Sequence, residues 1–361
     1  MADQQTILVA GYYISHGRGT RGVCEDLSDR LEDAGWHVLR TSFRLNSLLR
    51  LLDMLWATLR HAPTYDIVAL EVYSGRAFIW AEAVGFVLRR LRKPYVLTLH
   101  GGNLPPFARR YPARVRRLLA GADAITTPSH YLHQEMRAYR DDMIYLPNAI
   151  DLQAYDFKHR QRVTPNLAWL RAIHPVYAPW VAAEVVAHLK SDYPDIHLTM
   201  YGPLRDDAAH KRLQDVIDQH GLQANITIAG SIPKASVPAT LQAHDIFINT
   251  TTAESFGIAV IEGAACGLPI VTTNVGEIPN IWTHEQDALL VPPSDARAMA
   301  TAIRRLLDSP TLTAQLSRAG RTTAEQFSWE RVLPRWQHLL QRAEHDPAHP
   351  SNENVDLNTR E

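Results

Sequence analysis

Short apolar runs alternate with amphipathic, helix-like stretches along most of the chain. Six runs in the first half predict strands at Ile7–Tyr12, His37–Phe43, Asp66–Tyr73, Tyr95–His100, Ala124–Thr127 and Met143–Leu146. Segments rich in Arg and Leu lie between them and predict helices. Short strands that alternate with helices form right-handed crossovers, so this half predicts a parallel sheet covered on both faces.

The same pattern restarts after Asp151. Strands are predicted at Leu167–Ile173, His197–Tyr201, Ile226–Ala229, Asp245–Asn249, Pro269–Thr273 and Ala288–Val291. Helices fit between them, near 179–190, 207–219, 234–243, 257–265 and 295–307. We therefore expect an α/β protein with two Rossmann-like, doubly wound domains, each of which binds ligands at the C-terminal ends of its strands.

The pattern also sets the expected boundaries. The first domain covers 1–150, a charged, loop-like linker 151–165, and the second domain 166–322. Apolar positions at helical spacing predict a C-terminal helix over 323–343 that packs across the domains. The tail 344–361 is polar, has no periodicity and is expected to be disordered.

Charge is balanced overall and uneven along the chain. The formal net charge is −1, which gives no case for nucleic acid as a partner, and the apolar fraction of 46% is ordinary for a globular protein. Residues 1–150 carry 19 Lys and Arg against 14 Asp and Glu, a net charge of +5, and the remainder carries −6. A basic half either favours an anionic surface or is simply a solvated face.

Cysteine use and the N-terminus favour a cytoplasmic location. Cys24 and Cys266 are the only cysteines, too few for a disulfide framework. The segment MADQQTILVAGYY predicts a first strand rather than a signal peptide. No run approaches the ~18 apolar residues of a spanning helix, so any membrane contact is expected at the surface of the inner membrane.

The segment 254–279, ESFGIAVIEGAACGLPIVTTNVGEIP, carries the most chemical information. A buried strand ends just before it, and Gly257 opens a helix of small residues. The loop therefore presents the N–H groups of Phe256, Gly257 and Ile258 at a helix N-terminus, which favours phosphate binding. Glu254 precedes this helix, and Glu262 lies one and a half turns inside it.

This string resembles the E-x7-E signature of retaining GT-B glycosyltransferases, in particular glycosyltransferase family 4. The resemblance implies a GT-B fold, in which the first domain is on the acceptor side, the second binds a nucleotide sugar, and the two face a central cleft. It implies that Glu254 contacts the donor sugar near the reacting carbon, that Ser255 lies in the donor site, and that Glu262 binds the ribose. The alternative is a helix-end charge and a solvated glutamate.

Two motifs of the first half resemble the same family. Gly17 and Gly19, in SHGRGTRGV, follow the first predicted strand and resemble the glycine loop near the donor phosphates. His100 ends a predicted strand and is followed by two glycines, and the resemblance implies that its imidazole reaches the donor sugar. A plain turn and a structural histidine are the alternatives.

The diphosphate-binding basic residues depart from the family pattern. Arg171 is in its expected place, where two N–H donors can bind a phosphate, but the lysine that usually follows is missing from AWLRAIHPVYAPW. Arg205 is a candidate replacement. His174 and Tyr177 are alternatives for contacts to the base or diphosphate.

The segment LNSLLRLLDMLWATLRH predicts a helix with a broad apolar face. Such a helix either faces the core or lies in a membrane interface, where it would bring the protein to a lipid-linked acceptor.

Together these features predict a hexosyltransferase that needs no metal and no cofactor and retains the anomeric configuration. It would move a sugar from a nucleoside-diphosphate sugar to a hydroxyl acceptor, which is a glycan, a lipid-linked molecule or a small molecule, as in polysaccharide biosynthesis. The alternatives are a nucleotide-sugar-binding pseudoenzyme that serves another protein as its partner, and a GT-B-fold epimerase or phosphorylase.

Overall fold

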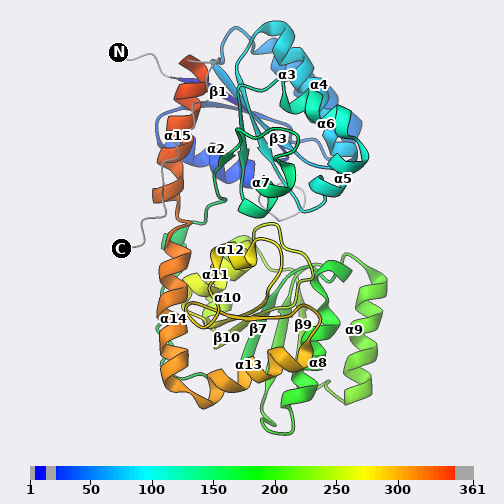
Figure 1. Cartoon of the computed structure of the whole chain (residues 1–361), viewed down its shortest axis with the longest axis vertical. Helices are drawn as coiled ribbons and strands as arrows, with labels where there is room; N and C mark the ends of the chain where they lie inside the picture. The colour runs from blue at the N-terminus through cyan, green and yellow to red at the C-terminus, as the bar shows by residue number, and fades with distance from the viewer. Residues whose placement is uncertain (1–4, 14–21, 346–361) are drawn as a thin grey trace. The chain divides into compact units, whose positions relative to one another are not determined.

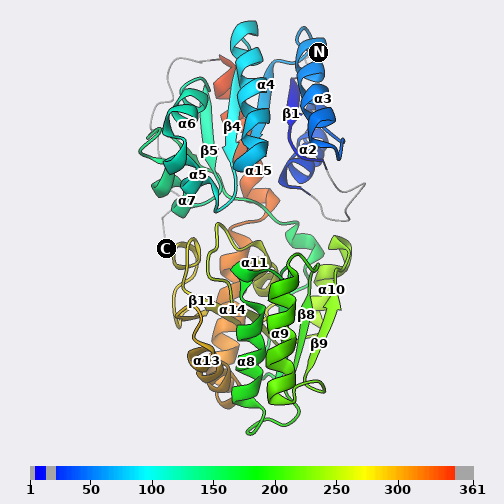
Figure 2. The same ribbon diagram turned by 90° about the vertical axis from the view of Figure 1, so that its right-hand side faces the viewer.

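The computed structural model describes residues 5–13 and 22–345 and divides the chain into two compact units. Unit 1 comprises Met1–Pro147 together with Leu333–Glu361, and unit 2 comprises Asn148–Val332. Figures 1 and 2 show strands wrapped by helices in each unit. Gly17, Gly19 and nearly all of the polar tail lie outside the described residues.

Unit 1 is built on a six-stranded sheet whose neighbouring strands pair in parallel. Its strands are β1 (Thr6–Ala10), β2 (His37–Thr41), β3 (Ile67–Val72), β4 (Tyr95–Leu99), β5 (Ala124–Thr127) and β6 (Ile144–Tyr145). The covering helices are α2 (Val23–Asp33), α3 (Ser47–Arg60), α4 (Phe78–Leu91), α5 (Leu104–Arg110), α6 (Pro112–Leu119) and α7 (His130–Met136), with a 3₁₀ turn η1 (Gly75–Ala77). The strand order is β2-β1-β3-β4-β5-β6.

Unit 2 repeats the design with a second parallel sheet, ordered β12-β11-β10-β7-β8-β9. Its strands are β7 (Asn166–Leu170), β8 (His197–Tyr201), β9 (Ile226–Gly230), β10 (Ile246–Asn249), β11 (Ile270–Thr273) and β12 (Leu289–Val291). Its α-helices are α8 (Pro179–Leu189), α9 (Asp207–His220), α10 (Val237–Gln242), α11 (Ile258–Ala265), α12 (Ile278–Ile281), α13 (Ala296–Asp308) and α14 (Pro310–Glu325). Three 3₁₀ turns complete the unit: η2 (Leu152–Ala154), η3 (Pro175–Tyr177) and η4 (Lys234–Ser236). The prediction of two doubly wound α/β sheets is confirmed.

The strand orders locate a switch point in each sheet, where consecutive crossovers diverge. In unit 1 the switch point lies between β1 and β3, and in unit 2 it lies between β7 and β10, which pair through Leu167 and Ala168 of β7. Ligands of doubly wound sheets bind at this point, beyond the C-terminal ends of the strands. The topology therefore places candidate sites after β1 and β3 and after β7 and β10.

The C-terminal helical segment differs from the expectation of one helix over 323–343. α14 ends at Glu325, and α15 (Trp329–His345) begins after a break. Ile150 causes the interruption: its N–H donates to Phe327 O (2.8 Å) and its carbonyl accepts from Trp329 N–H (3.3 Å). Backbone groups that bond to Ile150 are not available to continue one helix. α15 starts in unit 2 and ends in unit 1.

The segment 151–165, expected as a linker, packs into unit 2. Tyr155 is buried in an apolar cluster with Phe247, Val260 and Ile261. Arg160 is 2% exposed, and its guanidinium donates to backbone carbonyls that include that of His244 (3.0 Å).

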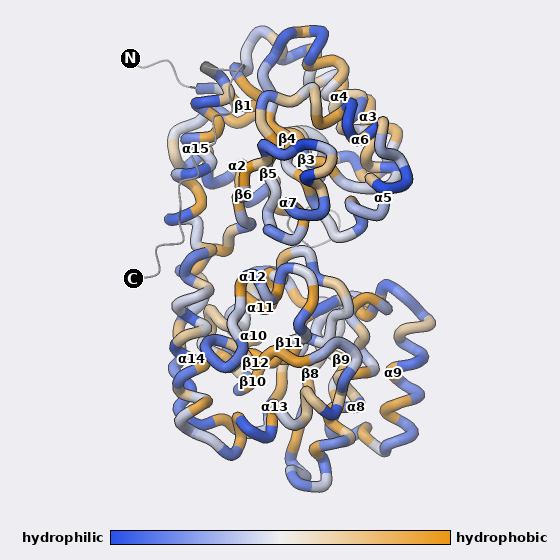
Figure 3. Tube along the Cα trace, in the orientation of Figure 1, coloured by the Kyte–Doolittle hydropathy of each residue, from blue (hydrophilic) through white to orange (hydrophobic). Residues whose placement is uncertain are grey.

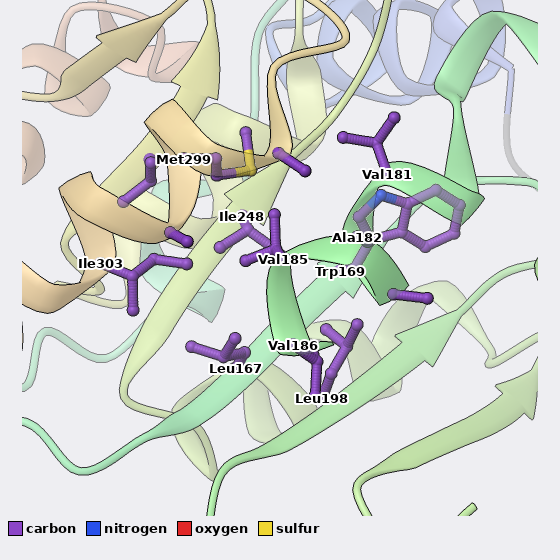
Figure 4. Close-up of a cluster of buried hydrophobic side chains, with 14 of the residues drawn as sticks. Leu167, Trp169, Val181, Ala182, Val185, Val186, Leu198, Ile248, Met299 and Ile303 are labelled. Atoms are coloured by element: carbon purple, nitrogen blue, oxygen red, sulfur yellow. The ribbon is translucent and has the colours of Figure 1, made fainter. Parts of the chain in front are cut away.

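One of the buried apolar clusters of unit 2 lies between its sheet and helices that include α8 and α13. Figure 4 shows Trp169 and Leu198 of the sheet beside Val181, Val185 and other aliphatic side chains. Figure 3 shows that the central strands are mainly hydrophobic, whereas covering helices such as α9 alternate in hydropathy. Among the described residues, no helix combines the length and apolar character needed to cross a bilayer.

Leu198→Ala should lower the free energy of unfolding of unit 2 by about 2–5 kcal/mol, because Leu198 is fully buried and truncation leaves a cavity. Leu204→Ala is the matched control, since Leu204 is 50% exposed and should change stability by less than about 0.5 kcal/mol. Urea denaturation of both variants measures the difference. Equal losses in the two variants would contradict the assignment of Leu198 to the core.

Candidate active site

The switch point of unit 2 brings together residues that are far apart in the sequence. Arg171 follows β7 directly, and Asn249 is the last residue of β10. The Arg171 Nε donates to Asn249 Oδ1 (3.3 Å), and Asn249 Nδ2 donates to Thr272 Oγ1 (3.0 Å). The guanidinium is therefore held at the C-terminal edge of three adjacent strands.

Arg171 forms an ion pair with Glu254. The Arg171 Nη2 donates to Glu254 Oε2, and the two side chains are only 10% and 9% exposed. A buried carboxylate is costly unless it is paired, so Arg171 compensates Glu254. The second oxygen, Oε1, accepts no hydrogen bond from the described part of the chain. Glu254 is thus neither a solvated side chain nor a simple helix-end charge.

The loop after Glu254 presents a row of backbone donors. Gly257 is the N-cap of α11 with φ of 96°, a conformation that favours glycine. Within the described residues, the N–H groups of Phe256, Gly257 and Ile258 donate to no acceptor, and half-buried Ser255 lies in the same turn. Unpaired N–H groups and the positive end of a helix dipole are features that favour anion binding.

Glu262 lies inside α11 and is 3% exposed. Its Oε1 accepts from Tyr155 Oη (2.7 Å) and pairs with Lys234 Nζ. Burial and the charge of Glu262 raise the pKa of Tyr155, so its hydroxyl stays protonated and donates. Neither partner was found from the sequence, because Tyr155 and Lys234 precede Glu262 by 107 and 28 residues and belong to no motif.

Tyr177 occupies the region where the family pattern has a lysine. Its ring centroid lies 5.4 Å from the Arg171 guanidinium carbon. A hydrogen bond joins the Tyr177 loop to the residue that follows β10, since Thr250 Oγ1 donates to Tyr177 O (2.7 Å). His174 accepts from the Val176 N–H (3.3 Å) and caps η3. An aromatic ring thus flanks Arg171 where a second cation was expected.

Arg205 lies on the same edge of the sheet, after β8. Its N–H donates to Ile173 O (3.1 Å), next to the segment that follows β7. The side chain is exposed, and within the described residues it makes no hydrogen bond or ion pair with Arg171 or Glu254. The structure therefore does not bring Arg205 into the ion-pair network.

His100 belongs to unit 1, where it follows β4 and is 6% exposed. Its ring stacks on Tyr73 with centroids 5.0 Å apart, and its Nε2 lies 3.4 Å from Glu71 Oε1 without an aligned hydrogen bond. Burial lowers the pKa of His100, and the charge of Glu71 opposes this shift. His100 is therefore buried beside a carboxylate, and burial disfavours the protonated form of its ring.

Glu71 is a further residue that the sequence did not reveal. It lies on β3, at the switch point of unit 1, and its Oε2 accepts from Tyr12 N–H (3.2 Å) and Tyr73 Oη (3.3 Å). The sequence shows an acidic residue near the end of an apolar strand. Only the strand order reveals that this residue lies at the switch point of unit 1. The predicted glycines Gly17 and Gly19 lie outside the described residues.

Two family models match the chain, one in each half. Residues 18–154 match the model described as Glycosyltransferase Family 4, and residues 165–323 match the model described as Glycosyl transferases group 1.

Curated relatives match over part of their length. A D-inositol 3-phosphate glycosyltransferase of Arthrobacter sp. (strain FB24) is 27% identical over 273 residues, 70% of this chain and 63% of the relative. A D-inositol 3-phosphate glycosyltransferase of Jonesia denitrificans is 26% identical over 219 residues, 56% of this chain and 52% of the relative. The chain thus spans less than two thirds of these relatives.

Solved structures match over nearly the whole chain. A sucrose-phosphate synthase from Thermosynechococcus elongatus superimposes with a TM-score of 0.75 at 20% identity, covering 94% of this chain and 99% of that one. HepE from Anabaena, solved in complex with UDP and glucose, gives 0.73 at 16% identity and covers 94% and 99%. At these identities the likeness concerns the fold, and it confirms the expected GT-B architecture.

The stability of unit 1 should depend on the protonation of His100. Because its folded-state pKa lies below the ordinary value of about 6.5, the unfolded chain binds the proton first as the pH falls. The contribution of neutral His100 to the free energy of unfolding is therefore present above about pH 6.5 and is lost as the pH falls toward the pKa of the folded state. Urea denaturation at several pH values should show a smaller acid loss in His100→Asn than in the wild type.

NMR titration of the His100 ring gives a direct check. The midpoint should lie below about 6.5, and Glu71→Gln should move it lower still, because the opposing negative charge is removed. A wild-type midpoint above the ordinary histidine value would show that the ion pair with Glu71 outweighs burial.

Proposed function

Because models of glycosyltransferase family 4 and glycosyl transferases group 1 match its two halves, the chain belongs to this family of enzymes, and we propose that it transfers a sugar from a nucleoside-diphosphate sugar to a hydroxyl acceptor. We propose further that the transfer retains the anomeric configuration and needs no metal. The observation that carries the proposal is the buried Arg171–Glu254 pair beside the free N–H groups that open α11.

In this proposal the diphosphate of the donor lies at the start of α11. The N–H groups of Phe256, Gly257 and Ile258 bind its oxygens, and the dipole of α11 favours the negative charge. Arg171 supplies a positive charge within reach of the same loop. These groups stabilise the charge that grows on the departing diphosphate, which is the role a metal plays in other transferases.

Glu254 acts on the sugar rather than on the phosphates. In a retaining transfer, the incoming hydroxyl and the leaving diphosphate share one face of the sugar, so the ring must be held rigidly. Arg171 orients the carboxylate through Oε2, which leaves Oε1 to accept from sugar hydroxyls. The role that the family resemblance implies for His100, which belongs to unit 1, stays a prediction.

Glu262 binds the ribose in this proposal. Its Oε1 is engaged by Tyr155 and Lys234, which fixes the carboxylate, so the ribose hydroxyls would bond to the remaining oxygen. Lys234 is 42% exposed, and its charge offsets that of the buried carboxylate.

We place the reaction in the cytoplasm, since both cysteines are free and buried.

A thermal-shift panel of UDP-, GDP- and ADP-sugars tests the donor class, because a ligand that binds only the folded state raises the melting temperature of the protein. Donor hydrolysis and transfer assays with the stabilising donor then test turnover.

Glu254→Gln should lower the turnover rate by about 100-fold or more, the scale of one lost transition-state contact. Donor affinity should change far less, because the phosphate donors remain. The control is Glu285→Gln, an exposed glutamate of unit 2, which should leave turnover at the wild-type level. Thermal unfolding of both variants verifies the fold. Turnover of Glu254→Gln close to the wild type would remove Glu254 from the catalytic machinery.

Chelation with EDTA should leave turnover unchanged. The reason is that backbone N–H groups and Arg171 supply the electrostatic stabilisation of the diphosphate in this proposal. The measurement is the initial rate before and after dialysis against EDTA. A rate that is lost on chelation and restored by Mg²⁺ or Mn²⁺ would refute metal independence while leaving the transfer reaction itself in place.

A further inference from the structure

Unit 1 exposes a large apolar surface on α3, on the loop before it and on the neighbouring helix α4. We name it the α3–α4 surface; its residues are Phe43, Leu45, Leu48, Leu49, Leu52, Trp56, Leu59, Ile79 and Phe86. Each of these side chains is between 46% and 64% exposed. Figures 1 and 2 both show α3 and α4 as neighbours.

The apolar residues of α3 lie opposite its buried face. Arg50, Met54, Ala57 and Thr58 face the protein, so at 100° per residue Leu48, Leu52 and Leu59 point to the other side. α3 is therefore anchored by one face and leaves an apolar stripe outside. Of the two interpretations of its sequence, the core-facing one does not hold for this stripe.

Basic side chains accompany this surface. Between Phe43 and Lys93 every exposed charged residue is an arginine, at positions Arg44, Arg60, Arg76, Arg90 and Arg92. In the described part of the chain, none of these five pairs with a carboxylate. The four acidic residues of the same stretch are only partly exposed, and Glu82 among them is paired with Arg114.

We propose that the α3–α4 surface docks onto an anionic lipid bilayer. Leucine and phenylalanine side chains enter the boundary between headgroups and acyl chains, and a tryptophan such as Trp56 prefers that boundary. The arginines pair with lipid phosphates, and their guanidinium groups match phosphate geometry. The Arg90 guanidinium carbon lies 5.0 Å from the Phe86 ring centroid, which shows that the apolar and cationic groups intermix.

Charge favours a bilayer over a second copy of the chain. In a two-fold dimer the same patch meets itself, so the unpaired arginines of one copy would face those of the other. An anionic membrane supplies the opposite charge instead. The net charge of +5 on residues 1–150 acts in the same direction. The proposal does not depend on transferase activity, because docking requires no donor or acceptor.

Vesicle flotation tests the proposal with the full chain. The wild type should float with vesicles of phosphatidylcholine that contain about 30% phosphatidylglycerol, and much less with phosphatidylcholine alone. Raising the salt concentration from about 0.1 to 1 M should weaken this binding, since exposed charges are screened. Absence of binding to the anionic vesicles would overturn the proposal.

Two sets of variants separate the apolar and the charged contributions. Leu52→Ser with Trp56→Ser should reduce binding to anionic vesicles at least about tenfold, since two apolar side chains that would enter the bilayer are lost. Leu204→Ser in unit 2 should not reduce it. Arg44→Gln, Arg60→Gln and Arg90→Gln together should reduce it roughly 100-fold. The control makes the same charge change in unit 2, at exposed Arg162, Arg297 and Arg318, and should bind like the wild type.

Two measurements identify the occupant directly. Brominated lipids should quench tryptophan fluorescence in the wild type and distinctly less in Trp56→Phe, which retains an aromatic ring and the fold. Light scattering gives the mass in solution. A wild-type dimer that Leu52→Ser with Trp56→Ser converts into monomers, or equal quenching in both proteins, would overturn bilayer docking.

Discussion

A buried ion pair between Arg171 and Glu254 organises the strand-end edge of unit 2. The pair joins the residue after β7 to the loop after β10, which are the two strands that flank the switch point. Breaking such a pair by removing one partner leaves an uncompensated charge in a poorly solvated place, at a cost of about 3–5 kcal/mol. The two loops are therefore fixed together by the same charges that the proposed chemistry uses.

The backbone around this pair is packed as tightly as its side chains. A Cβ on Gly202 would lie 1.9 Å from the carbonyl oxygen of Arg171, and a Cβ on Gly276 would lie 1.9 Å from that of Glu254. Each member of the pair is thus covered by a glycine from a neighbouring loop. The position of the two charges depends on contacts that only a residue without a side chain permits.

The strands of both sheets could be predicted from the sequence, whereas most side-chain contacts of the candidate site could not. Parallel strands are buried on both faces, so they are apolar throughout and stand out as apolar runs in the sequence. The helix-opening donors after Glu254 followed from a local strand–loop–helix pattern. The strand order sets the contacts between residues that are distant in the sequence, and no local sequence pattern predicts it. These contacts are the pairing of Arg171 with Glu254, of Lys234 with Glu262 and of His100 with Glu71. The break at 326–328 likewise depends on bonds from a distant segment.

The exchange of hydrogen bonds between Ile150 and the segment 327–329 has a consequence for biosynthesis. The chain enters and leaves unit 2 at this place, so unit 2 is one uninterrupted stretch, whereas unit 1 is assembled from two pieces. Gln5, before the first strand, bonds to Glu344 at the far end of α15 (2.8 Å). At about 5–20 residues per second, the ribosome adds this partner many seconds later. The first strand of unit 1 is therefore synthesised well before the helical segment that contacts the residue preceding it and completes the unit.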